Sequence, residues 1–333
     1  MRFPITDLLP RIVESLAAHP RLVLEAPPGA GKTTQVPLAL LDAQWLDGRK
    51  IVMLEPRRVA ARAAAGFMAK QLGEAVGDTV GYRIRFENKV SARTRIEVVT
   101  EGILTRMLQD DPMLEDVGAL LFDEFHERHL AGDLGLALAL DVQAAYCSDP
   151  GSGPGQALRI VAMSATLDGE RLAQFLDAPR LSSAGRAFPV EVAHFPARRE
   201  EVLEHQARRA IEHTLATHPG DLLVFLPGQR EIARVEAALA PLRPSGTSPR
   251  ERGEDGWGAV EVLTLHGELP VEQQSRVLQP ASDGQRRVVL ATNVAESSVT
   301  LPGVRVVIDS GLAREPRFDP NSGFSRLDVV SIS

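Results

Sequence analysis

The chain has 333 residues, of which 44% are hydrophobic and 24% are charged. This length allows two domains of ordinary size, and this composition excludes disordered, collagen-like and membrane-spanning proteins. The best candidate for an apolar span, residues 134–140, is bracketed by Asp133 and Asp141 and is far shorter than the roughly 20 residues that a bilayer requires. No signal-peptide core is present at the N-terminus. The single cysteine, Cys147, excludes an internal disulfide and a cysteine-based zinc site, and we expect a cytoplasmic monomer with no membrane contact.

The net charge of −7 argues against a protein that coats nucleic acid by bulk attraction, although it leaves room for a local basic groove. Of the 37 basic residues only four are lysine (Lys32, Lys50, Lys70 and Lys89), so 33 are arginine. Each arginine could grip a phosphate with its planar fork. Genomic base composition is the alternative explanation, and we favour it for the chain as a whole.

Apolar runs typical of buried strands alternate with amphipathic stretches along the chain. We expect strands at 21–25, 50–54, 95–99, 117–122, 158–163, 221–226, 259–265, 286–291 and 304–309. We expect helices at 57–72, 132–146, 200–217 and 229–240. This alternation predicts an α/β protein whose parallel sheets are flanked by crossover helices.

The two halves share a local plan. Residues 22–41 and 222–239 each read as an apolar strand, a Pro-Gly loop and a helix, but the second copy lacks Gly-Lys-Thr. We interpret this as a duplicated α/β unit, although any two strand–helix units look alike at this level. The change of pattern at 187–198 predicts domains of residues 1–187 and 188–333. Two segments rich in turn-forming residues, 148–156 and 244–258, are predicted surface loops.

A phosphate-binding loop is predicted between the first strand and the helix that follows it. The segment APPGAGKTT (26–34) matches a Walker A loop, with Ala26 where the strict pattern has glycine. Its N–H groups and the helix N-terminus would hold phosphate oxygens, Lys32 would neutralise the terminal phosphates, and Thr33 would hold Mg²⁺. The residues assigned to this cofactor site are Gly29, Ala30, Gly31, Lys32, Thr33 and Thr34.

The acidic partner of such a loop is expected at the end of another buried strand. Residues 117–122 are apolar and lead directly into Asp123 and Glu124. We predict that Asp123 orders the magnesium shell and that Glu124 orients and deprotonates the attacking water. Nearby, His126 and His129 raise the possibility of a metal site, but their spacing is not HExxH and no thiolate accompanies them, so we interpret them as hydrogen-bonding residues.

Taken together, these motifs resemble those of the DEAH-box helicases of superfamily 2, and the sequence DEFHER most resembles the bacterial HrpB-type members. The resemblance covers the chain from about residue 5 to its end. The matching segments, in the order of the family, are EPRRVAARA (55–63), TEGILTRML (100–108), DEFH (123–126), SAT (164–166), FLPGQREI (225–232) and LATNVAESSVTLPGVRVVIDSG (290–311).

The resemblance implies two RecA-like domains that use ATP and Mg²⁺, with nucleotide between them and single-stranded nucleic acid across them, RNA being favoured over DNA. It implies that Ser164 and Thr166 link hydrolysis to the domain junction and that His126 senses the nucleotide state. The backbone contacts to nucleic acid would come from Arg57, Thr100, Glu101, Gly102, Gly228, Thr292 and Asn293.

The sequence departs from the family in one respect. The final family motif QxxGRxGR, whose arginines act as fingers on the γ-phosphate, does not occur here. Because such a finger contributes roughly 10³–10⁵ in rate, we expect this chain to bind nucleotide and hydrolyse it slowly. A fragment of a longer protein is the favoured explanation, with a natural short form as the alternative.

The sequence therefore predicts the motor core of an ATP-dependent RNA helicase, in which ATP hydrolysis stimulated by nucleic acid drives translocation and unwinding. The alternative is a nucleotide-gated module that clamps RNA or a ribonucleoprotein without unwinding it. A small-molecule P-loop kinase explains the phosphate loop but leaves residues 188–333 unexplained.

Overall fold

A computed structural model describes residues 3–148, 157–165, 169–183, 189–239, 260–282, 284–296, 301–320 and 322–332. The chain divides into two compact units, Met1–Pro189 (unit 1) and Val190–Ser333 (unit 2). The domain boundary predicted after residue 187 falls in a stretch outside the described residues and stays a prediction. Most of the two predicted surface loops, 148–156 and 244–258, lies outside them as well.

Unit 1 is built on one eight-stranded sheet, ordered β4-β3-β5-β2-β6-β7-β1-β8. Every neighbouring pair in it is parallel except β3 with β4. In chain order the strands are β1 (Arg21–Glu25), β2 (Lys50–Leu54), β3 (Val80–Ile84), β4 (Glu87–Lys89), β5 (Ile96–Val99), β6 (Val117–Phe122), β7 (Arg159–Ser164) and β8 (Arg180–Ser182).

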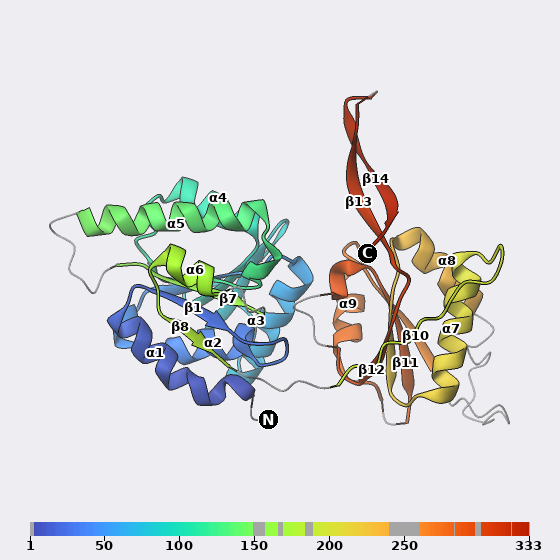
Figure 1. Ribbon diagram of the computed structural model, residues 1–333. Coiled ribbons are helices and arrows are strands. Elements are labelled where there is room, and N and C mark those ends of the chain that lie inside the picture. Colours follow the sequence, from blue (N-terminus) through green and yellow to red (C-terminus); the bar gives the residue numbers. More distant parts are fainter. Residues whose placement is uncertain are drawn as a thin grey trace. The chain divides into compact units, whose positions relative to one another are not determined.

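Helices cover both faces of this sheet, as Figure 1 shows. The α-helices are α1 (Leu9–Ala18), α2 (Lys32–Leu40), α3 (Arg58–Leu72), α4 (Glu101–Asp110), α5 (Leu130–Ser148) and α6 (Gly169–Leu176), joined by the short 3-10 turns η1 (Pro4–Leu8), η2 (Gln44–Leu46) and η3 (Phe125–Glu127). One apolar core packs α1, α2 and α3 on one face of the sheet, and a second core packs α4, α5 and α6 on the other. Burial on both faces explains the continuous apolar runs of β1 and β6.

Unit 2 repeats the plan on a smaller scale, with a four-stranded parallel sheet in the order β10-β11-β9-β12. Helices α7 and α8 contribute to a core on one face, and α9 contributes to a core on the other. The elements are α7 (Leu203–Thr217), β9 (Asp221–Phe225), α8 (Gln229–Leu239), β10 (Val260–Leu265), α9 (Val271–Leu278), β11 (Arg286–Ala291), η5 (Asn293–Ala295) and β12 (Val304–Asp309). An antiparallel hairpin, β13 (Leu312–Asp319) with β14 (Phe324–Ser331), follows and extends beyond the sheet (Figure 1).

The predicted α/β class is confirmed, and each predicted strand is present to within one residue at either end over its described residues. The predicted parallel sheets flanked by helices are present; the antiparallel β3–β4 pair at one edge of the first sheet and the separate β13–β14 hairpin add to them. The periodicity also missed β3, β4, β8 and the hairpin. Strands β4 and β8 have only three residues each, and the largely exposed hairpin mixes polar and apolar residues without a regular period, so none of these is a long apolar run.

Arginines at the amino ends of the strands explain part of the high arginine content. These ends face the C-termini of the crossover helices, where backbone carbonyls lack intrahelical partners. In unit 1, Arg21 donates to the Leu176 carbonyl of α6 and Arg159 donates to the Leu16 carbonyl of α1. In unit 2, Arg286 donates to the carbonyls of Leu215 and His218 at the end of α7. A structural role for these arginines adds to the explanation from base composition.

A buried ion pair anchors the same end of unit 2. Arg287 is 2% exposed, and its Nε and Nη2 each lie 2.9 Å from Oδ2 of Asp221. Arg287 also donates to the Pro302 carbonyl at 2.7 Å, while the Asp221 N–H donates to the Gly303 carbonyl. The pair thereby fixes the turn that leads into β12.

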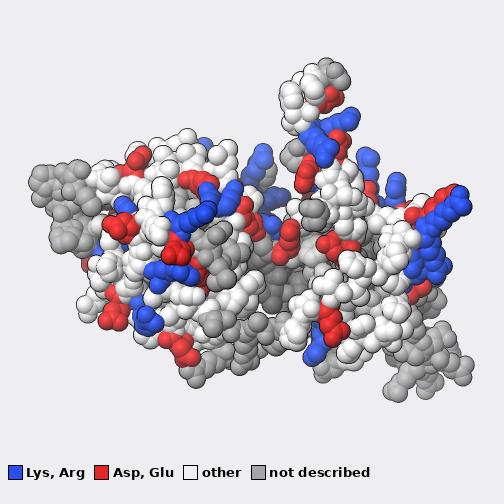
Figure 2. Space-filling model, viewed as in Figure 1, with Lys and Arg blue, Asp and Glu red and all other residues white. Residues whose placement is uncertain are grey.

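Within the described residues, no helix has the length and apolar character needed to cross a membrane. On the face seen in Figure 2, basic and acidic side chains are interspersed in both units, and the β13–β14 hairpin carries charges of both signs. This distribution fits the prediction that nucleic acid would be held by a local set of residues rather than by a basic coat.

We predict that Arg287→Met destabilises the protein by about 3–5 kcal/mol, because it leaves the Asp221 carboxylate buried without its cation. The control is Arg326→Met, which breaks an exposed pair with Asp328 on the hairpin and should cost about 0–1 kcal/mol. Urea denaturation followed by circular dichroism compares the two variants. Equal midpoints would contradict the anchoring role.

Candidate functional site

Register places the predicted site residues of unit 1 along one edge of its sheet. Strand β2 is aligned so that Leu54 lies opposite both Val99 of β5 and Phe122 of β6, while Glu25 of β1 lies opposite Ser164 of β7. The residues that follow these strands therefore meet at the carboxyl ends of parallel strands. In open α/β sheets this edge is where ligands bind.

The loop from 26 to 31 joins β1 to α2 and begins beside β7, where the Ala26 N–H donates to the Ser164 carbonyl at 3.0 Å. Gly29 and Gly31 have φ values of 75° and 93°, a conformation that side chains rarely adopt. A Cβ on Gly31 would also lie 2.9 Å from the Phe3 ring. The predicted site residues Ala30, Thr33 and Thr34 lie in this loop and in the first turn of α2. The Ala30 N–H donates to the Pro27 carbonyl and the Thr34 N–H to the Gly31 carbonyl, and the positive end of the helix dipole at this turn is suited to an anion.

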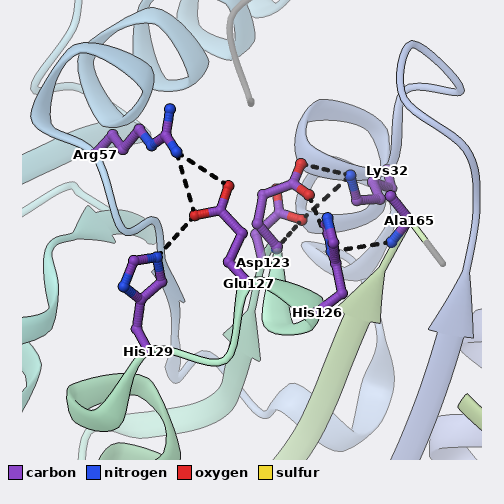
Figure 3. A network of polar contacts seen from close by, with 8 residues as sticks. Lys32, Arg57, Asp123, His126, Glu127, His129 and Ala165 are labelled. Carbon is purple, nitrogen blue, oxygen red and sulfur yellow. Dashed lines mark hydrogen bonds and ion pairs between the residues drawn. The ribbon is translucent and has the colours of Figure 1, made fainter. Parts of the chain in front are cut away.

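Lys32, at the start of α2, lies against the acidic pair that follows β6. Its Nζ donates to Glu124 Oε1 at 2.7 Å and lies 3.7 Å from Asp123 Oδ1 (Figure 3). All three residues are buried, with exposed fractions of 4% for Lys32, 4% for Asp123 and 6% for Glu124. The structure thus brings the predicted loop lysine and the predicted carboxylates into direct contact.

Charge in this cluster holds Lys32 in its ammonium form. Burial alone would lower the pKa of Lys32, but the carboxylates of Asp123, Glu124 and Glu55 outweigh it and raise the pKa above its ordinary value. Glu55 is fully buried and directly follows β2. A cation flanked by carboxylates and held beside a helix N-terminus is an arrangement that a polyanion such as a nucleotide triphosphate can join.

The Asp123 carboxylate fits a divalent cation. Its Oδ1 accepts the Glu124 N–H at 2.9 Å, whereas Oδ2 is buried and accepts no hydrogen bond from the described residues. Carboxylate and hydroxyl oxygens are the donors that Mg²⁺ prefers, and it is usually bound through one or two carboxylates together with substrate phosphates. Thr33, one residue beyond Lys32, is the hydroxyl predicted for the same ion.

Glu124 has a left-handed backbone, with φ of 48°, and Arg128 has φ of 52°. The three residues of η3 lie between them, and the Glu127 N–H donates to the Glu124 carbonyl at 2.9 Å. Left-handed residues other than glycine are strained and cluster at functional sites. The backbone therefore turns sharply at the predicted catalytic carboxylate.

His126, in this turn, links the acidic pair to the strand that ends in Ser164. The Ala165 N–H donates to His126 Nδ1 at 3.3 Å, and this atom lies 3.4 Å from Glu124 Oε2. Accepting that N–H requires an unprotonated Nδ1, so the tautomer with the proton on Nε2 fits the geometry. Ser164 is buried at the end of β7, while Thr166, the other predicted coupling residue, lies outside the described residues.

The predicted nucleic-acid contacts of unit 1 lie further along the same edge. Arg57 precedes α3, and Thr100, Glu101 and Gly102 form the start of α4. Burial raises the pKa of Glu101; His129 opposes this shift and the Glu127 carboxylate adds to it. Gly102 is exposed and has open space around its Cα.

In unit 2, the strand register aligns the carboxyl ends of β9, β10 and β11 at one edge of the sheet. Phe225 of β9 lies opposite Ala291 of β11, and Leu265 of β10 lies opposite the same residue, so Thr292 follows the strand ends and donates its N–H to the Leu265 carbonyl. Asn293 is exposed at the start of η5. Gly228 is buried, and a Cβ there would lie 2.7 Å from Arg314 Nε of β13. The side chain present at this position is therefore that of Arg314.

Sequence reasoning missed several residues of the unit 1 edge. Glu55 follows an apolar strand, as Asp123 does, and that signal could have found it. Glu127 contacts both Arg57 and His129, but nothing in its sequence context distinguishes it from a solvated carboxylate (Figure 3). Arg314 lies in the hairpin that periodicity did not predict.

A glycine loop, a buried lysine and a strand-end acidic pair, on one of two α/β units, define the class of P-loop proteins. A model of the DEAD/DEAH box helicase family matches residues 10–175, and a model of the helicase conserved C-terminal domain matches residues 206–322. The chain belongs to the DEAD/DEAH box helicase family, and its two units are RecA-like domains.

Similar proteins include the ATP-dependent RNA helicase HrpB of Escherichia coli K12, which is 44% identical over 99% of this chain and 38% of the relative. The pre-mRNA-splicing factor ATP-dependent RNA helicase prp22 of Schizosaccharomyces pombe is 35% identical over 99% of this chain and 27% of its own length. The crystal structure of the E. coli DEAH/RHA helicase HrpB superposes with a TM-score of 0.86, at 44% identity, over 100% of this chain and 40% of that one. The chain thus spans less than half the length of these relatives.

The cluster around Lys32 predicts a pH-dependent loss of stability in Lys32→Met. Because the folded-state pKa of Lys32 is raised, its contribution to folding is fully present below the ordinary value of 10.5 and is lost only as pH rises through the raised value. At pH 7 the variant leaves buried carboxylates uncompensated, which should cost about 3–5 kcal/mol. Above its raised pKa, Lys32 of the wild type also loses its proton and no longer compensates the carboxylates, so the deficit should shrink at high pH.

Lys50→Met is the matched control, because Glu97 keeps the Arg83 guanidinium at 2.8 Å when the Lys50 contact at 3.0 Å is removed. Denaturant titrations at pH 7 and at high pH compare the variants. Equal deficits for the two lysine variants at pH 7, or a Lys32→Met deficit that does not change with pH, would contradict the described electrostatics.

Proposed function

We propose that this chain is the motor core of an ATP-dependent RNA helicase, in which nucleic acid stimulates ATP hydrolysis and hydrolysis drives movement along a strand. The observation that carries the proposal is the direct contact of Lys32 with Asp123 and Glu124 at the mouth of the glycine loop. Membership of the helicase family supports this proposal. The relatives are named as ATP-dependent RNA helicases, which supports ATP as the nucleotide and RNA as the bound nucleic acid. The single cysteine supports a cytoplasmic location.

The loop residues of unit 1 would bind the triphosphate. The N–H groups from Gly29 to Thr34 and the Lys32 ammonium would hold the phosphate oxygens, with Lys32 turning from Glu124 toward the terminal phosphate. Thr33 and Asp123 would hold Mg²⁺, which when bound supplies charge neutralisation between the β- and γ-phosphates. Once Lys32 has turned from Glu124 toward the phosphate, the Glu124 carboxylate would accept a proton from the attacking water.

The strand would be held by polar groups that carry no base preference. In unit 1 these are the Arg57 guanidinium and the turn at Thr100, Glu101 and Gly102. In unit 2 they are Thr292 and Asn293, with the Gly228 turn positioned beneath Arg314. Guanidinium, hydroxyl and amide groups aimed at phosphate and sugar suit tracking along any sequence. Residues Ser164, Thr166 and His126 would couple the hydrolysis site to this grip.

The proposal predicts that Glu124→Gln lowers RNA-stimulated ATP turnover by about 10²–10⁴-fold, because the amide cannot accept the water proton. ATP binding should persist, since the amide oxygen can still accept from Lys32. Glu115→Gln, a neutralised carboxylate on the exposed turn before β6, is the control. Steady-state turnover and equilibrium binding of a fluorescent ATP analogue measure the two effects, and undiminished turnover in Glu124→Gln would remove the catalytic assignment.

Arg57 should contribute one phosphate contact. Binding of single-stranded RNA is expected to weaken with salt, with a log–log slope of about −0.7 per neutralised phosphate. Arg57→Ala should reduce this slope by about 0.7 and weaken binding equally for different sequences. Fluorescence anisotropy across salt concentrations measures the slope, with Arg93→Ala, on an exposed turn, as the control. An unchanged slope in Arg57→Ala would remove Arg57 from the strand-binding set.

Strand displacement distinguishes the helicase from a nucleotide-gated RNA clamp. A duplex with a single-stranded overhang should be separated in an ATP-dependent manner by a helicase. Tight RNA binding that depends on a non-hydrolysable ATP analogue, without displacement under turnover conditions, would instead favour the clamp.

A further inference from the structure

Glu127 lies between two groups of residues that the proposed function assigns to different tasks. On one side it contacts Arg57, the arginine proposed to bind the nucleic-acid backbone. On the other it ends the three-residue turn η3, which begins directly after Glu124. Figure 3 shows Glu127 reaching toward Arg57 and His129, while Asp123, His126 and Lys32 form the neighbouring group.

The contact between Glu127 and Arg57 is long for an ion pair. Arg57 Nη2 lies 3.4 Å from Oε1 and 3.5 Å from Oε2 of Glu127, compared with about 2.7–2.9 Å for a typical charge-assisted hydrogen bond. Both side chains are partly buried, at 20% and 14% exposure, so their charges are only partly screened by water. A phosphate that offers Arg57 a shorter, two-pronged contact can therefore compete with Glu127 for the guanidinium.

One short turn of backbone connects Glu127 to Glu124. The Glu127 N–H donates to the Glu124 carbonyl at 2.9 Å, and left-handed residues, Glu124 and Arg128, bound the turn on both sides. A movement of Glu127 would therefore either carry the Glu124 backbone with it or break this hydrogen bond. Glu124 is the proposed general base and also the partner of Lys32.

Two other ionisable side chains, His129 and Glu101, lie near Glu127. His129 Nε2 lies 2.8 Å from Glu127 Oε2, and the Glu101 carboxylate is close enough for Glu127 to raise its pKa. With Arg57 engaged elsewhere, Glu127 would retain His129 as a donor and face Glu101 as a like charge. The neighbouring pair, Arg128 with Asp133, is a separate contact at 3.0 Å.

We infer that Glu127 is a positioning residue that couples strand binding at Arg57 to the orientation of Glu124. Without RNA it holds Arg57; when a phosphate takes the guanidinium, η3 is released and Glu124 leaves Lys32 to orient the attacking water. This inference rests on the proposed function and deepens it, because it assigns to one contact the stimulation of hydrolysis by nucleic acid.

The test compares ATP turnover with and without saturating single-stranded RNA in the wild-type chain, Glu127→Gln, Arg57→Ala and the double variant. Glu127→Gln keeps the shape of the side chain but removes its charge. We expect the ratio of stimulated to basal turnover to fall at least about fivefold, while RNA binding by anisotropy is no weaker than in the wild type. Asp133→Asn removes a carboxylate from the same edge without touching Arg57 and should leave the ratio within about twofold.

If Glu127 acts through Arg57, the double variant should lose no more stimulation than the more affected single variant. A Glu127→Gln ratio equal to the wild-type ratio would overturn the coupling role while leaving the proposed function standing. An equal loss of stimulation in Asp133→Asn would show that charge at this edge, rather than the contact between Glu127 and Arg57, is responsible. That result would also overturn the coupling role. A wild-type chain that binds RNA without any stimulation would overturn both.

Discussion

A lysine enclosed by carboxylates at the end of a parallel sheet is the arrangement on which the rest of this structure depends. Lys32, Asp123 and Glu124 are each at least 94% buried. The ammonium of Lys32 and the two carboxylates carry opposite charges, so neither kind of group is stable there without the other. Their contact requires the glycine loop to return α2 to the sheet beside β1 and requires β6 to end at the same level.

The sheets separate two kinds of polar contact onto opposite edges. At the amino ends of the strands, arginines such as Arg159 and Arg286 donate to helix C-terminal carbonyls and stabilise the fold. At the carboxyl ends, the register of β2, β5 and β6 places Glu55, Thr100 and Asp123 in one row. The same chemical groups therefore serve stability at one edge and form the proposed ligand site at the other, and an arginine count alone does not separate them.

The sequence allowed the phosphate loop, the acidic pair and the strand positions to be predicted because each depends on local features: glycine spacing, a buried apolar run and the residue that ends it. The contacts of Glu127 could not be predicted in this way, because Arg57 is distant in sequence and only the register of β2 against β6 brings them together. The burial of Gly228 beside Arg314 depends on a hairpin whose largely exposed residues show no regular polar–apolar period. Local patterns thus indicated the candidate site residues, while tertiary pairing determined which of them touch.

The central claim is that Lys32 exchanges a carboxylate for phosphate when nucleotide binds. The most direct measurement is a crystal structure of the chain with Mg²⁺ and a non-hydrolysable ATP analogue. We expect terminal phosphate oxygens within hydrogen-bond distance of Lys32 Nζ, Mg²⁺ held by Thr33 and Asp123, and a Glu124 carboxylate turned toward the attacking water. Nucleotide bound away from residues 29–34, or phosphates out of reach of a Lys32 that still pairs with Glu124 at 2.7 Å, would contradict it.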